Sequence, residues 1–134
     1  MPHDPITAPQ HYTVYPVQPI EISRYLSFCL GNAVKYMFRA PHKGGAEDLK
    51  KALQYLAWEE ETPSAPLNAK PHMVVEEKIG DLCLFLSERQ PSYSWWQAAF
   101  LEHVGLYVYS GESKHIAGMR DAVESMLLAM EGKP

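Results

Sequence analysis

The chain has 134 residues, of which 46% are hydrophobic, and its 12 Lys and Arg against 16 Asp and Glu give a formal net charge of −4. A chain of this length buries enough apolar surface to fold as one domain without disulfides. The acidic balance argues against binding along a nucleic-acid backbone, which needs a concentrated basic face, and we expect no sequence-specific nucleic-acid partner. No apolar segment approaches the length that spans a bilayer, and no export signal opens the chain, so we expect a cytoplasmic protein without a membrane partner.

Residues 1–19 predict an extended arm. Five prolines fall in this segment, at positions 2, 5, 9, 16 and 19. Each proline fixes φ and withholds a backbone donor, which disfavours helix and sheet alike. Pro19 also suits the first position of the helix that the next residues predict.

Residues 20–61 predict a helical motif of three segments. The first, "IEISRYLS", is short, and the second, "FCLGNAVKYMFRA", is ended by Pro41. Glu47 and Asp48 open the third segment, where their charge favours a helix N-terminus. Its apolar residues recur at helical spacing to about Glu61.

The stretch "TPSAPLNAKP", residues 62–71, predicts a linker because it holds three prolines in ten residues. Residues 72–134 then predict three more helices, with "GLYVYS" as the most β-prone part. The fold class that follows is all-α: a compact, single-domain bundle of five or six helices with an extended Pro-rich N-terminal arm.

Polar residues follow one face of the second and third helical segments. The second segment places them at offsets of three, four and seven: Asn32, Lys35, Tyr36 and Arg39. The third repeats offsets of three and seven with Asp48, Lys51 and Tyr55. Residues at these offsets share a helix face, and a short connection predicts antiparallel helices. We therefore expect the two polar faces to point at each other.

The connecting loop "HKGG" adds Lys43 to this region, and Gly44 and Gly45 would let backbone N–H groups approach an anion at the next helix start. With Lys35, Arg39 and Lys51, the loop would form a phosphate site. The alternative is that these cations are solvated and that Asp48 and Lys51 form an ordinary surface pair. Spacing alone leaves both interpretations open.

"HY" followed by "QPIEI", then "FCLGNAVKYMFRAPHKGG" and "EDLKKALQYL", resembles a small phage-associated family that includes the nucleotide kinase of T7-like phages. The family pattern is roughly H-Y, a short helix, G-N-x-x-K-Y-x-x-R-A, a Lys/Gly-rich loop and D-L-x-K-A-x-x-Y. The resemblance covers residues 9–58. Pro41 and His42 depart from it, because the family more commonly has Gly and Lys there.

The resemblance implies a protein that phosphorylates deoxynucleoside monophosphates without a P-loop. Lys35, Arg39 and Asp48 would be its catalytic residues. The residues that would hold the ligand and its phosphates are His11, Tyr12, Asn32, Tyr36, Lys43, Gly44, Gly45, Lys51 and Tyr55. ATP would be the phosphoryl donor, and Mg²⁺ would be held through phosphates, so we assign no metal site to the protein alone.

Two functions follow from the sequence. The first is a phage-type nucleotide-binding protein, kinase-like, in the cytoplasm of a bacterial host. The second is a non-catalytic phage protein that binds and inhibits a host defence complex. The C-terminal half would then supply either that docking surface or a homo-oligomer interface. The inhibitor would present a free arm, whereas our expectation for the pocket is that the arm folds back, so that His11 and Tyr12 cover the face of Asn32, Lys35 and Arg39.

Overall fold

The computed structural model describes residues 15–67, 69–88 and 93–132 of the chain. The described residues form six helices and no strand, which confirms the predicted all-α bundle of five or six helices. The helices are α1 (Pro19–Ser23), α2 (Phe28–Arg39), α3 (Gly45–Glu61), α4 (Ala69–Ser87), α5 (Tyr93–Ser110) and α6 (Lys114–Met130). Within these residues, no helix has both the length and the apolar character needed to cross a lipid bilayer.

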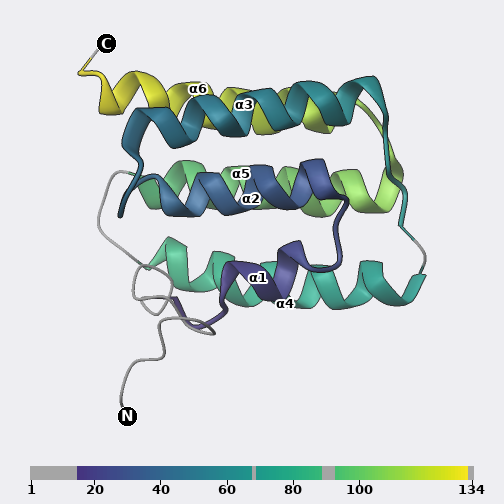
Figure 1. Ribbon diagram of the computed structural model, residues 1–134. Helices are drawn as coiled ribbons and strands as arrows, with labels where there is room; N and C mark the ends of the chain where they lie inside the picture. Colours follow the sequence, from purple (N-terminus) through teal and green to yellow (C-terminus); the bar gives the residue numbers. More distant parts are fainter. Residues whose placement is uncertain (1–14, 68, 89–92, 133–134) are drawn as a thin grey trace.

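The helices form two layers (Figure 1). α1, α2 and α3 lie side by side in chain order, and α4, α5 and α6 form the second layer behind them, so that α2 and α5 occupy the centre. Each helix contacts its counterpart in the other layer: α1 meets α4, α2 meets α5 and α3 meets α6. This order brings α2 and α3 together as an antiparallel pair on one surface of the molecule.

Local sequence explains most helix boundaries. Pro19 stands at the first position of α1, as predicted. Ser27 caps α2, because its Oγ accepts a hydrogen bond from the Leu30 N–H at 3.0 Å. Gly111, with φ at +75°, ends α5 in the left-handed conformation that glycine adopts without strain. The β-prone "GLYVYS" stretch lies inside α5, because tertiary packing outweighs its weak local preference.

Two predicted boundaries need correction. The first helix ends at Ser23 rather than near Ser27, because the chain turns there to place Ser27 as the cap of α2. The linker predicted over 62–71 is too long, since α4 already begins at Ala69. Pro71 is compatible with this start, because the first-turn N–H groups of a helix have no partner within the helix.

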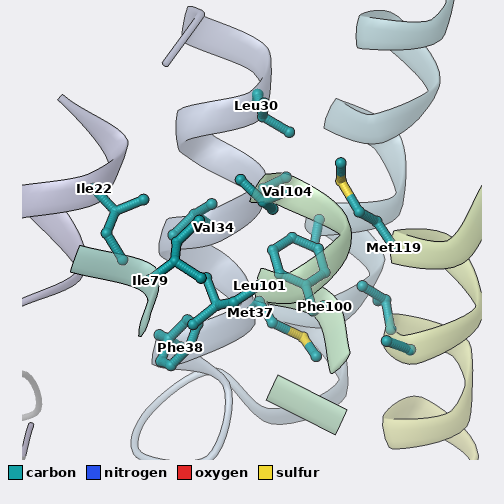
Figure 2. Packing of buried hydrophobic residues seen from close by; sticks show 14 of the residues in the cluster. Ile22, Leu30, Val34, Met37, Phe38, Ile79, Phe100, Leu101, Val104 and Met119 are labelled. Carbon is teal, nitrogen blue, oxygen red and sulfur yellow. The ribbon is translucent and has the colours of Figure 1, made fainter. Parts of the chain in front are cut away.

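The core joins both layers (Figure 2). Side chains of α2 and α5 meet at its centre, flanked by Ile22 of α1 and Met119 of α6. The labelled side chains are all buried: Ile22, Leu30, Val34, Met37, Phe38, Ile79, Phe100, Leu101, Val104 and Met119. Their contacts fix α2 on the bundle, which leaves its opposite face for α3 and for solvent.

Glu59 is a carboxylate buried at the end of α3, with 1% of its surface exposed. Its Oε1 accepts a hydrogen bond from Ser27 Oγ at 2.6 Å. Its Oε2 accepts from the Ser64 N–H at 2.8 Å, from Ser64 Oγ at 2.6 Å and from the Tyr107 hydroxyl at 2.6 Å. Hydrogen bonds to a buried charge are what make its burial tolerable. Glu59 therefore links the start of α2, the end of α3, the 62–67 connection and α5.

Glu59→Gln should destabilise the protein by about 1–3 kcal/mol, because an amide nitrogen replaces one acceptor oxygen and leaves buried donors without a partner. Glu61→Gln, at an exposed position two residues later, is the control and should change the free energy of unfolding by less than about 0.5 kcal/mol. Urea unfolding followed by circular dichroism measures both. Equal stability of the two variants would contradict the structural role of Glu59.

Burial, together with the hydrogen bond to Glu59 and its charge, raises the pKa of Tyr107 to about 12. In the unfolded chain the pKa of tyrosine is about 10. The stabilisation of the folded protein that comes from this pKa difference is therefore fully present below pH 10. It is lost as the pH rises towards 12, because the unfolded state loses the Tyr107 proton first. Wild-type stability should fall more steeply over this pH range than that of Tyr107→Phe, as measured by urea unfolding at successive pH values.

Candidate functional site

The α2–α3 face is the surface where polar and aromatic residues of these two helices meet. It consists of Phe28, Asn32, Lys35, Tyr36 and Arg39 from α2 and Asp48, Lys51, Tyr55 and Trp58 from α3. Contacts between the helices fix their antiparallel register. Arg39 meets Asp48 at one end of the face. Tyr55 lies between Tyr36 and Phe28 and contacts both rings towards the other end. The two faces point at each other, as the helical spacing predicted.

Three cations surround the ring of Tyr36. Lys35 Nζ lies 5.1 Å from the ring centroid and Lys51 Nζ lies 5.3 Å from it. The guanidinium carbon of Arg39 is 5.9 Å from the same centroid. These distances are within the range of cation–π attraction. We call Tyr36, Lys35, Arg39 and Lys51 the Tyr36 cluster; it concentrates positive charge in an acidic chain.

The ion pair between Arg39 and Asp48 closes one end of the face. Arg39 Nε lies 3.2 Å from Asp48 Oδ2, and the Asp48 side chain is only 1% exposed. Neither Arg39 Nε nor Asp48 Oδ2 has a hydrogen-bond partner among the described residues, so this contact is an ion pair and not a hydrogen bond. Asp48 therefore approaches the guanidinium at its Nε side, and the terminal NH₂ groups of an arginine have the geometry that suits two oxygens of a phosphate.

The backbone of the loop between the helices is hydrogen-bonded to the end of α2. The Lys43 N–H donates to the Arg39 carbonyl and the Gly45 N–H donates to the Ala40 carbonyl, at 3.0 Å and 2.9 Å. The Gly45 amide is thus used inside the turn, and the expected approach of an anion to the start of α3 stays a prediction. The Lys43 side chain is exposed, and the structure does not place it in the Tyr36 cluster.

Gly44 makes room for Asp48. A Cβ atom at Gly44 would lie 2.0 Å from the Asp48 carboxyl carbon, although the backbone φ of −92° is open to any residue. The glycine is therefore required by the close approach of a carboxylate and not by the turn. The predicted role of Gly44 beside a phosphate stays a prediction.

The described end of the arm lies against the same loop. The Tyr15 hydroxyl and His42 Nε2 are 2.9 Å apart and hydrogen-bonded, and the Tyr15 ring packs edge-on against Phe38. His11 and Tyr12, which we expected to cover the face, lie outside the described residues. Their predicted position near Lys35 and Arg39 stays a prediction.

The other end of the face is aromatic and includes two residues that the sequence analysis missed. The Tyr55 ring stacks on Tyr36 at 5.9 Å with an interplanar angle of 11°. Phe28 and Trp58 stand edge-on against Tyr55, at 5.8 Å and 5.4 Å. Both could have been found from spacing, because Phe28 lies four residues before Asn32 and Trp58 three residues after Tyr55 on the same helix faces.

Asn32 uses part of its hydrogen-bonding capacity within α2. Its Nδ2 donates to the Phe28 carbonyl at 2.8 Å, one turn earlier. This contact sets the direction of the amide beside Phe28. Asn32 lies on the predicted face, but one of its donors is satisfied by the helix itself.

Among the described residues, no three His, Cys, Asp or Glu side chains gather where they could hold a metal ion. Asp48, the acidic residue of the face, is buried and paired with Arg39.

A comparison with known protein families finds a match to the N-terminal part of the chain, which carries the α2–α3 face. Residues 6–57 match a family described as a protein of unknown function, DUF3310. The matched segment contains the whole α2–α3 face except Trp58, but its description gives no activity. No curated protein and no solved structure matches the chain.

Gly44→Ala should cost about 1–3 kcal/mol of stability, because the new methyl group displaces the buried Asp48 carboxylate. Gly80→Ala is the matched control, since a Cβ at Gly80 meets open space on a helix and should be neutral or stabilising by up to about 1 kcal/mol. In an Asp48→Ala background, Gly44→Ala should cost much less. Urea unfolding of all variants measures this coupling, and additive effects would contradict the steric explanation.

Proposed function

We propose that the α2–α3 face binds the phosphate groups of a nucleotide. The observation that carries this proposal is the Tyr36 cluster, in which Lys35, Arg39 and Lys51 gather around one ring. Asp48 offsets part of their positive charge, but the three cations still repel one another. A phosphate group would turn this repulsion into attraction, because each cation could donate a charge-assisted hydrogen bond to it.

The finer proposal is a deoxynucleoside monophosphate kinase-like activity, supported by the family resemblance of residues 9–58. In this reaction a terminal oxygen of the monophosphate attacks the γ-phosphorus of ATP, and the bond from this phosphorus to the β-bridging oxygen breaks. The products are a deoxynucleoside diphosphate and ADP. Lys35, Arg39 and Lys51 would hold the reacting phosphates together and offset their charge, which is the main protein contribution to phosphoryl transfer. Asp48 would position Arg39 through Nε.

Binding is tested by thermal denaturation and calorimetry with the four deoxynucleoside monophosphates. A ligand that binds the native state raises the melting temperature. Lys51→Ala should weaken binding about tenfold, because it removes a charged hydrogen-bond donor. Lys50→Ala is the matched control, since Lys50 is exposed and one residue away on another helix face.

Detection of ADP formed from ATP and a deoxynucleoside monophosphate tests the kinase step. Arg39→Ala should abolish most of this product. Binding without ADP would remove the kinase part and leave a nucleotide-binding protein. If no nucleotide raises the melting temperature, the phosphate proposal fails, and the non-catalytic inhibitor of a host complex becomes the better explanation of the chain.

A further inference from the structure

We propose that the aromatic end of the α2–α3 face, formed by Phe28, Tyr55 and Trp58, is a base-stacking subsite that accepts different nucleobases. This inference rests on the proposed phosphate site and extends it to the other end of the ligand. In this proposal the protein recognises the nucleobase by stacking of aromatic rings and not by hydrogen bonds to the edge of the base.

The first supporting observation is exposure. Phe28 is 75% exposed and Trp58 is 45% exposed, whereas Phe38, the next phenylalanine along α2, is fully buried. An aromatic ring in water gains free energy when another flat ring covers it. The two exposed rings come from different helices and meet at one residue, Tyr55, so they form one aromatic surface.

The second observation is continuity with the cations. Tyr55 stacks on Tyr36, the ring that Lys35 and Lys51 approach. Along α2, Phe28 precedes Lys35 by seven residues, or about 10 Å at the helical rise. The face thus has a cationic end and an aromatic end. This order suits a ligand with phosphate at one end and an aromatic ring at the other.

The third observation concerns selectivity. At the aromatic end, one Asn32 donor is already used by the Phe28 carbonyl. Stacking on aromatic side chains depends little on base identity, because every base has a π-face. We therefore expect the four deoxynucleoside monophosphates to bind within about tenfold of one another, with the larger purines favoured.

Calorimetry with two kinds of probe tests the subsite: the four deoxynucleoside monophosphates and inorganic pyrophosphate. Phe28→Ala should weaken monophosphate binding about tenfold and leave pyrophosphate binding unchanged. Phe28→Trp should retain binding, because it keeps a stacking ring. Trp95→Ala is the matched control, since Trp95 is 77% exposed on α5 and lies outside the face.

The possible results separate this inference from the phosphate proposal. If pyrophosphate binds and Phe28→Ala leaves monophosphate affinity unchanged, the stacking subsite is wrong while the phosphate site stands. An equal loss for both probes would also overturn the subsite, because it would indicate a structural role for Phe28. A preference for one base above about a hundredfold would overturn base tolerance, since stacking alone does not discriminate so strongly. If neither probe binds, both proposals fail together.

Discussion

The buried carboxylate of Glu59 is the interaction on which the arrangement of the helices depends. It accepts hydrogen bonds from Ser27, Ser64 and Tyr107, which belong to the start of α2, the 62–67 connection and α5. A buried charge must keep its donors, because water does not replace them in the interior. Both layers of the bundle are therefore tied at one point, and α2 starts where Ser27 meets the end of α3.

A second carboxylate fixes the opposite end of the same helix pair. Asp48 forms an ion pair with Arg39 next to the loop that joins the helices, and the absence of a side chain at Gly44 leaves space for the Asp48 carboxylate. The α2–α3 pair is thus anchored at both ends, and the aromatic and cationic side chains lie between the anchors. Anchoring both ends fixes the backbone that carries these side chains, so the helices need not be rearranged when a ligand binds. The stability of the pair and the proposed function share the same contacts.

The face also explains how an acidic protein could attract an anion. Net charge describes the whole surface, whereas binding depends on the local arrangement of charge. Lys35, Arg39 and Lys51 lie around Tyr36, and the ring partly stabilises the cations that approach it. The aromatic end adds the apolar contact that simple phosphate ions would not use. Under the proposed function, the two ends together would favour a nucleotide over either a free phosphate or an apolar ligand.

The sequence by itself determined the helices and the shared face of Asn32, Lys35, Tyr36 and Arg39, because helical periodicity and prolines act over a few residues. Only the tertiary structure decided what individual residues within those patterns do. Glu59 stands in a run of three glutamates, and nothing local distinguishes it from its exposed neighbours. The place of Phe28 in the face likewise depends on its ring contact with Tyr55 of α3. Glu59 and Phe28 meet partners that are distant along the chain, Ser27 and Tyr55, so spacing can place a residue on a helix face but packing decides which side chain it contacts.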